Sequence, residues 1–256
     1  MYRLHLGVHP PAGVVGPEAA ALSRLGRWCA IPRSVCGVAP SPAPCGEHFL
    51  EGVRELTRRG GARDAAVDIR AVPFGSAPGG AGWREGSWVS RHIIGADDAL
   101  AVVREHLSRS RRCRSTGRTA VVVEEFIAAD ASAHVHSRAR GRFEEAVALV
   151  RAAHGVAVGG VDPVGAADTY LVRRTDLNIL VEWFADKYRQ LVPTPAGLAE
   201  RPLPEALRDR PCLPERRIRD MVRIGLVAEA VMGRPVRMEL AWKNGVVYVL
   251  WCEAAG

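Results

Sequence analysis

Strand-type and helix-type segments follow one another along this chain in an irregular order, and this order most limits the folds open to it. Apolar residues alternate, or run continuously over a few positions, in segments that we predict to be strands: 2–8, 65–72, 119–128, 167–173 and 178–183. Apolar residues at helical spacing predict helices at 17–25, 48–58, 97–108, 143–154 and 214–232. A parallel sheet requires a regular strand–helix–strand repeat, which this order lacks. The sequence therefore predicts an α+β fold with mostly antiparallel sheets.

The remaining stretches are assigned by composition. Residues 132–137 are expected to form a hairpin with 119–128, and residues 30–46, rich in Pro, Cys and Gly, are expected to form a loop. A Gly-rich loop follows residue 72 and carries Trp83, with Trp88 close behind it. The two indole rings either stack on a ligand or cover a core, and the sequence leaves both interpretations open.

The chain closes with two strands joined at Asn244 and Gly245, a dipeptide typical of a tight hairpin turn. Strand alternation puts Trp251 and Glu253 on the same face. The length of the turn decides what lies beside them. A three-residue turn with Gly245 in a left-handed bulge sets Glu239 beside Trp251, whereas a two-residue turn sets it on the opposite face.

Composition limits the compartment and the partners. No apolar run is long enough to span a membrane, and the N-terminus lacks the features of a signal peptide, so we expect a cytoplasmic protein without membrane contact. The six cysteines lack metal-ligand spacing and are expected to be free thiols, with a Cys36–Cys45 disulfide as the less favoured alternative. The net charge of +7 comes almost entirely from arginine, which fits codon usage in a GC-rich genome. The densest basic run, 108–118, has no interleaved aromatic residues, so we do not expect nucleic-acid binding.

Several segments of the sequence resemble a known family. From residue 167 onward they are, in order, ADTYLVRR, KYRQLVPTPAG, PLPEALRDRPCLPERRI and GRPVRMELAWKNGVVYVL. Their order and spacing resemble the ATP-binding domain of phosphoenolpyruvate synthase, pyruvate phosphate dikinase and rifampin phosphotransferase. Upstream, collinear but less specific matches are GPEAAALSRL, DIRAV, REGSWVSRHIIGADDAL and VVVEEFIAADASAHVHSR. The resemblance implies an ATP-grasp fold, with two lobes, expected at 1–118 and 119–256, around a central cleft that clamps a nucleotide.

The resemblance also implies phosphate and metal ligands, most of which differ here. Glu18 stands where the family has a lysine that faces the phosphates, and Glu253 where it has an arginine that contacts them. Arg70 and Glu239 match the family's strand arginine and metal-binding glutamate, and Trp251 replaces the glutamine that shares the metal. Since these last two residues share a metal site in the family, the three-residue hairpin turn is favoured. Arg70, Glu239 and Glu253 are the candidate catalytic residues.

Other positions are candidates for a ligand pocket. Glu124 replaces the family's hinge glutamine, and Val158 replaces an acidic residue. His134 and His136 lie two residues apart on one strand, so they share a face and form a possible metal pair. With no third ligand placed, we expect no metal. The predicted pocket comprises Glu18, Glu124, Phe126, His134, His136 and Trp251.

Positions that build the fold are kept, whereas positions that touch phosphate or metal are mostly replaced. The leading hypothesis is a degenerate, stand-alone ATP-grasp domain without phosphoryl transfer and without ATP or Mg²⁺ as cofactors. Its interlobe cleft would bind or transform a small molecule, as in specialised metabolism. One alternative is an active Mg-ATP-dependent phosphotransferase or ligase that uses Arg70, Glu239 and Lys187. Another is a non-catalytic domain that binds a protein partner.

Overall fold

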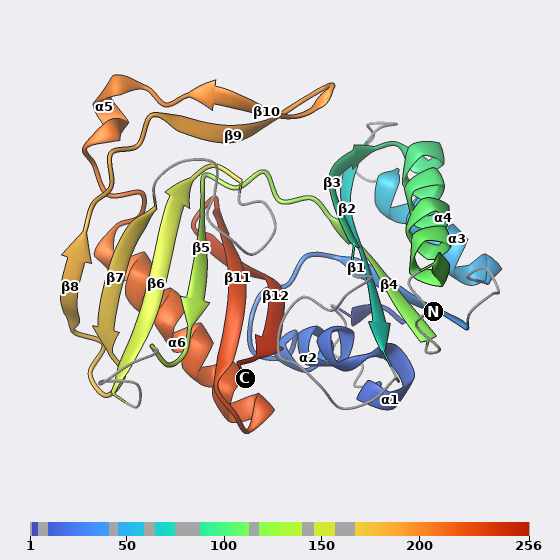
Figure 1. Ribbon diagram of the computed structural model, residues 1–256, viewed down its shortest axis with the longest axis horizontal. Helices are drawn as coiled ribbons and strands as arrows, with labels where there is room; N and C mark the ends of the chain where they lie inside the picture. Colours follow the sequence, from blue (N-terminus) through green and yellow to red (C-terminus); the bar gives the residue numbers. More distant parts are fainter. Residues whose placement is uncertain are drawn as a thin grey trace.

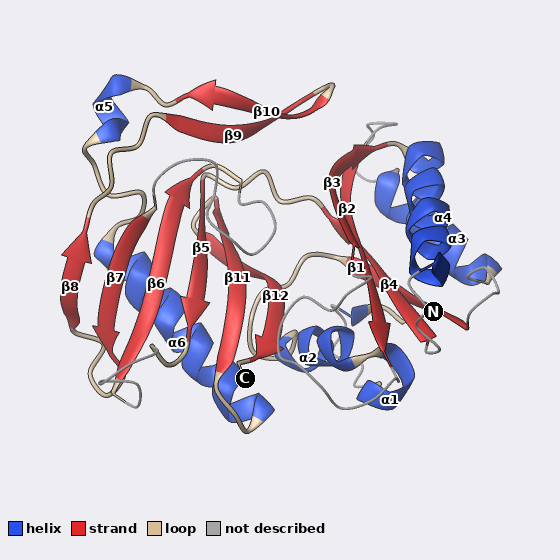
Figure 2. Cartoon of the chain, in the orientation of Figure 1, coloured by secondary structure: helices blue, strands red, loops and turns tan. Residues whose placement is uncertain are grey.

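The computed structural model describes residues 2–4, 10–40, 46–58, 65–74, 88–112, 118–139, 146–156 and 167–255. Within these residues the strands form a four-stranded sheet, a six-stranded sheet and a separate two-stranded hairpin (Figure 1). Every pair of named strands is antiparallel. Figure 2 shows the two larger sheets as separate lobes, each with its own helices. The predicted α+β class, two lobes with mostly antiparallel sheets, is confirmed.

The first lobe is built on the four-stranded sheet, with the strand order β1-β4-β2-β3. Its strands are β1 (Ser34–Pro40), β2 (Ala66–Phe74), β3 (Trp88–Ile94) and β4 (Arg118–Glu125). One face is covered by two helices, α3 (Glu47–Thr57) and α4 (Ala96–Arg112). On α3, Phe49, Val53 and Leu56 repeat at helical spacing, and this apolar stripe packs into one core with Val67 and Ile69 of β2.

The second lobe is built on the six-stranded sheet, with the strand order β12-β11-β5-β6-β7-β8. Its strands are β5 (Ala131–His136), β6 (Val147–His154), β7 (Asp168–Arg173), β8 (Ile179–Trp183), β11 (Val236–Lys243) and β12 (Val246–Ala254). One face is covered by α6 (Glu215–Met232), which buries Ile218, Met221 and Val222. Between β8 and α6 the chain forms the separate hairpin and a short helix: β9 (Arg189–Thr194), β10 (Gly197–Pro202) and α5 (Glu205–Arg208).

Two short helices follow near the N-terminus: α1 (Ala12–Val15) lies at the end of the first sheet, and α2 (Pro17–Leu25) lies between the lobes (Figure 1). Helix α2 packs against β12 and α6. Leu22 of α2 belongs to the same apolar cluster as Val122 of β4 and Met221 of α6. One continuous core therefore reaches from the first sheet through α2 into the second lobe.

Most of the predicted elements are confirmed. The predicted helices at 17–25, 48–58, 97–108 and 214–232 correspond to α2, α3, α4 and α6. The predicted strands at 65–72, 119–128, 167–173 and 178–183 correspond to β2, β4, β7 and β8. Of the predicted strand 2–8, Tyr2 pairs with Cys36 in an isolated bridge, and residues 5–8 lie outside the described residues.

Three local predictions are wrong. Within the helix predicted at 143–154, residues 147–154 form strand β6, whose place between β5 and β7 overrides the helix propensity of its alanines, while residues 143–145 lie outside the described residues. The loop predicted at 30–46 contains β1, an outer strand where a terminal proline is tolerated, while residues 41–45 lie outside the described residues. Strand β5 does not form a hairpin with β4, because it pairs with β6 and β11 in the other sheet.

Strand β4 fixes where the two sheets divide the chain. The boundary expected from the sequence lies between residues 118 and 119. However, β4 pairs with both β1 and β2, so it is an inner strand of the first sheet. The connection 126–130 then carries the chain into the second sheet, and the sheets divide after Glu125.

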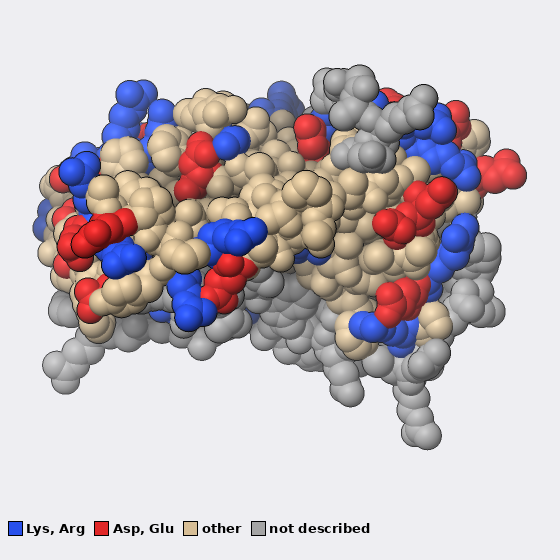
Figure 3. Space-filling view, turned by 90° about the horizontal axis from the view of Figure 1, so that it is seen from above, with Lys and Arg blue, Asp and Glu red and all other residues tan. Residues whose placement is uncertain are grey.

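Some predictions on partners and thiols can be compared with the surface. On the face shown in Figure 3, basic and acidic groups are interspersed around a broad uncharged area. None of the helices in the described ranges is both long and apolar enough to cross a membrane. Cys29, Cys212 and Cys252 are free thiols. The alternative Cys36–Cys45 pair involves a residue outside the described ranges.

The closing hairpin has a two-residue turn, so the predicted three-residue turn is wrong. Lys243 pairs with Val246, and Asn244 and Gly245 both have positive φ, 49° and 81°, as the mirror-image turn of tight hairpins requires. The pairing register nevertheless shifts between Glu239 and Leu240, because β12 has a β-bulge there, with one extra residue compared with β11. Glu239 therefore pairs with Trp251 as expected, but the bulge lies inside the strand and not at the turn.

Candidate functional site

Five charged side chains meet where the first sheet faces β11 of the second. Each is at most 5% exposed. We name them the interlobe charge cluster: Asp68 and Arg70 of β2, Arg91 of β3, Glu124 of β4 and Glu239 of β11. Four come from the first lobe, and Glu239 alone of the five comes from the second, so a bond from any other member of the cluster to Glu239 joins the lobes.

Both guanidinium groups of the cluster reach Glu239. Arg91 donates to Glu239 through Nη2 and to Asp68 Oδ2 through Nη1 at 3.0 Å. Arg70 donates through Nε to Glu124 Oε1 at 3.3 Å, and its Nη2 lies 3.7 Å from Glu239 Oε2. Arg70 and Glu239, two of the candidate catalytic residues, therefore form an ion pair that is part of a larger network.

A bulge in β3 aims Arg91 into the cluster. The pairing of β2 with β3 shifts between Val67 and Ile69, so β3 carries an extra residue opposite Asp68. His92, next to Arg91, adopts a positive φ of 54°, which is uncommon for a residue with a side chain. Its backbone N–H donates to Asp68 Oδ1 at 2.9 Å, and this bond holds the bulge. Bulges of this kind redirect a neighbouring side chain.

The charges of the cluster do not balance if all groups are ionised, since three carboxylates face two guanidinium groups. Burial raises the pKa of Glu124 to about 7, although Arg70 partly offsets it. Burial also raises the pKa of Asp68. Burial by itself would also raise the pKa of Glu239, but the positive charges of Arg91 and Arg70 outweigh this effect, so the pKa of Glu239 is lowered. A proton on Glu124 therefore completes the charge balance near neutral pH.

This proton gives a testable pH dependence. The folded-state pKa of Glu124, about 7, exceeds the ordinary value of about 4.3 for a glutamate. Between these two pH values the folded state binds more protons than the unfolded state. The contribution of Glu124 to the free energy of unfolding therefore falls as the pH rises from about 4.3 to about 7. Glu124→Gln removes the titration. Urea unfolding from about pH 5 to about pH 8 should show the stability of the variant rising relative to the wild type. Glu200→Gln, the same substitution at an exposed position of β10, is the matched control, and a pH-independent difference for Glu124→Gln would contradict the assignment.

Trp251 and Glu18 lie next to the cluster. Trp251 is 8% exposed and points between the lobes, where it lines a small cavity with Arg70 and with Glu18 at the start of α2. The cavity volume is about 20 Å³, which is room for about one water molecule. The structure thus brings these predicted site residues together, around a space far smaller than a nucleotide.

Glu253 lies two residues beyond Trp251 but belongs to a different ion pair. Its partner is Arg237, directly across from it on β11. Burial raises the pKa of Glu253, while Arg237 acts in the opposite direction. The charge of Glu253 is therefore balanced within the second lobe.

His134 and His136 lie on β5, on the face of the six-stranded sheet opposite α6. His134 pairs with Glu239 on one side and with Arg151 of β6 on the other. Because paired residues of antiparallel strands share a face, the register defines a row across the whole sheet. In order, the row is Trp251, Glu239, His134, Arg151, Thr169 and Trp183. We call this the row face; Trp251 and Glu239 are buried at one end of it, and Trp183 is 72% exposed at the other.

The remaining predicted residues lie elsewhere or have other contacts. Glu124 is inside β4, not in the interlobe connection. Phe126 packs edge-on against His92, with ring centroids 4.5 Å apart. Lys187 is buried and bonds Asp168 at 2.6 Å, away from the cluster. Val158 and Trp83 lie outside the described residues, and Trp88 begins β3 under the guanidinium group of Arg109.

Sequence reasoning missed Asp68 and Arg91. Asp68 had a usable signal, because two charged residues flank Ile69 in an otherwise apolar strand and so share one face. Arg91 had none, because its strand was not predicted and its direction depends on the bulge. Among the described residues, no three His, Cys, Asp or Glu side chains are placed to hold a metal ion.

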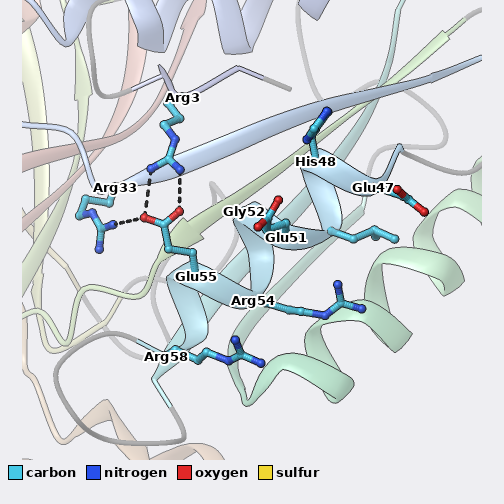
Figure 4. Close-up of a pocket in the computed structure, with 10 residues that line it drawn as sticks. Arg3, Arg33, Glu47, His48, Glu51, Gly52, Arg54, Glu55 and Arg58 are labelled. Carbon is cyan, nitrogen blue, oxygen red and sulfur yellow. Dashed lines mark hydrogen bonds and ion pairs between the residues drawn. The ribbon is translucent and has the colours of Figure 1, made fainter.

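A second hollow lies on the outer side of α3, away from the cluster (Figure 4). Its volume is about 1140 Å³, and charged side chains line most of it. Glu55 accepts two hydrogen bonds from Arg3, at 3.2 and 2.5 Å, and its Oε1 lies 3.5 Å from Arg33. We call this hollow the α3 groove.

Comparison with known proteins identifies the family. Residues 105–254 match the domain described as pyruvate phosphate dikinase, AMP/ATP-binding domain. A probable phosphoenolpyruvate synthase from Methanocaldococcus jannaschii is 28% identical over 103 residues, which are 40% of this chain and 9% of that protein. The chain thus spans a small part of the curated relative it matches.

Solved structures of ligases are also similar at low sequence identity. A D-alanine–D-alanine ligase from Bacillus anthracis, complexed with ATP, is 10% identical, with a TM-score of 0.42 over 95% of this chain and 54% of that one. The corresponding ligase from Helicobacter pylori is 13% identical, with a TM-score of 0.34 over 90% of this chain and 50% of that one. The matched domain, by contrast, covers more than half of the present chain. This chain belongs to the family of pyruvate phosphate dikinase AMP/ATP-binding domains.

Proposed function

We propose that this member of the family does not transfer phosphoryl groups from Mg-ATP, and that the row face instead binds, or helps to transform, a small molecule that is not a nucleotide. The observation that carries the proposal is that Glu239 is buried and held in ion pairs with two arginines. It occupies the position of the family's metal-binding glutamate, yet it is 1% exposed and contacts two buried guanidinium groups.

The residues present do not fit a magnesium ion. Mg²⁺ requires hard oxygen ligands in near-octahedral geometry and keeps several waters. Both carboxylate oxygens of Glu239 already contact Arg70 or Arg91. Releasing them would take one of its two carboxylate partners from each buried guanidinium group, which costs several kcal/mol. Arg70 and Arg91 thus provide, next to Glu239, the positive charge that a metal ion would otherwise provide.

The surroundings do not fit a triphosphate either. Glu18 faces the small cavity where the family has a lysine, and an anion at this position repels phosphate. The indole of Trp251 borders the same space. A cavity of about 20 Å³ holds roughly one water, so a nucleotide could enter only if the lobes separated.

The exposed end of the row face has the chemistry of a small-molecule surface. Trp183 is largely exposed, and Leu171 and Val181 lie on the same face beside it. Thr169 and Arg151 follow toward the centre of the sheet. An indole and aliphatic side chains beside a hydroxyl and a guanidinium suit a ligand with an apolar or aromatic body and an acidic group.

Calorimetric titration with Mg-ATP tests the proposal. We expect no binding at a Kd below about 1 mM, because the charge cluster would have to be broken first. Titrations with MgCl₂ alone and with ATP in EDTA separate metal binding from nucleotide binding. Micromolar binding of Mg-ATP would overturn the proposal and favour the phosphotransferase alternative, in which Glu239→Ala should abolish ATP turnover.

A further inference from the structure

A stripe of charged residues runs along the exposed side of α3, on the outer surface of the first lobe. Glu47, Glu51, Arg54 and Arg58 all line the α3 groove (Figure 4). Successive helical residues are about 100° apart, so these four lie within about 60° of one another around the helix axis. All four are exposed. They therefore form one narrow, solvent-facing stripe, which we call the α3 stripe.

The α3 stripe lacks partners in the described part of the chain. No hydrogen bond or ion pair joins the side chain of any of these four residues to another described residue, whereas the side chain of neighbouring Glu55 is held by Arg3 and Arg33. Within the helix, Glu47 and Glu51 are a like-charged pair at i,i+4, and so are Arg54 and Arg58. Such pairs destabilise a helix, so an external partner of opposite charge at each end would stabilise this one.

The order of the charges is self-complementary. The acidic pair precedes the basic pair, so a second copy of α3 lying antiparallel to the first would set acidic ends on basic ends. The spacing of these charges is also symmetric about a point midway between Gly52 and Val53. Glu47 then faces Arg58 of the other copy, and Glu51 faces its Arg54. A parallel arrangement would instead oppose like charges.

We propose that α3 is the contact surface of a homodimer, in which two copies of the helix pack antiparallel, each in the α3 groove of the other. A two-fold axis makes every ion pair occur twice, as in most homodimers. Charge complementarity fixes the partner and the register. Because the contact is polar and exposed at its rim, the dimer is reversible and weakens as salt rises. This proposal does not depend on the proposed function.

Charge-reversal variants test the contact by sedimentation equilibrium at low ionic strength. We expect the wild type to dimerise, and Glu51→Arg and Arg54→Glu to weaken self-association at least about tenfold each, because each variant opposes like charges. An equimolar mixture of the two variants should dimerise again, since every opposed pair across the axis is then of opposite charge. Glu200→Arg, the same charge change on exposed β10, is the matched control and should behave as the wild type.

The outcomes separate the possibilities. Circular dichroism and thermal melting first establish that both exposed-site variants fold. A wild type that stays monomeric at about 200 μM and low salt would overturn the proposal, because steering charges raise association most under these conditions. A dimer unaffected by Glu51→Arg would also overturn it and place the contact elsewhere. Failure of the mixture to dimerise would exclude the antiparallel register.

Discussion

Replacing Arg91 with methionine should lower the free energy of unfolding by about 3–5 kcal/mol, the cost of removing one partner from a buried ion pair. Arg91 is 5% exposed and joins Asp68 to Glu239. Methionine matches the apolar length of the side chain but leaves both carboxylates without their main cation. Arg70 remains near Glu239, at 3.7 Å, which is too far to compensate fully. Chemical denaturation monitored by tryptophan fluorescence measures the loss.

Arg189→Met provides the matched control, because Arg189 makes a solvent-exposed ion pair with Glu200 on the β9–β10 hairpin. Exposed pairs contribute about 0–1 kcal/mol, so the same substitution should have a small effect there. The double variant Arg91→Met with Glu239→Gln should be less destabilised than the sum of the single variants, because both members of the pair lose their charge. Equal effects of Arg91→Met and Arg189→Met would show that the cluster does not stabilise the fold.

Much of the fold could be predicted because its patterns are local. The apolar spacing of α3 and of α6 and the position of the turn at Asn244 and Gly245 each follow from neighbouring residues. The errors arise where pairing between strands decides. Strand β6 carries alanines that favour a helix, but it pairs on both sides, with the strands before and after it in the chain, β5 and β7. Sequence spacing alone does not reveal such neighbours.

The hairpin register shows how a correct expectation can rest on the wrong cause. Placing Glu239 beside Trp251 required one extra residue between them, and the sequence offered the turn as its place. The turn is regular, and the extra residue sits in a bulge within β12. Bulges depend on packing across the sheet rather than on a local motif, so the sequence carried no signal for this one.

Of the interlobe charge cluster, Arg70, Glu124 and Glu239 were named from the sequence, whereas Asp68 and Arg91 were not. Arg70, Glu239 and Trp251 are placed together, as the family resemblance implied. The resemblance gave no reason to expect Arg91, which takes the charge-balancing place next to Glu239. Glu124 was expected at a hinge and is instead inside a strand, where burial raises its pKa. The sequence did not show how the buried charges balance one another, because this balance depends on the distances between them.

Replacing Lys187 with methionine should destabilise the second lobe by about 3 kcal/mol, because it strands a buried carboxylate. The ammonium group of Lys187 bonds Asp168 Oδ1 at 2.6 Å and the Ala185 carbonyl at 3.1 Å. Asp168 also accepts from the backbone N–H of Ala185 and of Cys212, so it ties β7 to the segments on either side of the β9–β10 hairpin. These two backbone donors remain in the variant, which places the loss at the lower end of the range for buried pairs.

The other lysine of the chain is a matched control for this prediction. Lys243 bonds Asp130 at the same distance, 2.6 Å, but the two side chains are 34% and 43% exposed, compared with 2% and 0% for Lys187 and Asp168. Lys243→Met should therefore cost less than about 1 kcal/mol. Both values come from urea unfolding, and protease cleavage between residues 184 and 214 should accelerate in the Lys187 variant alone. Equal losses for the two variants would mean that burial does not set the strength of these pairs.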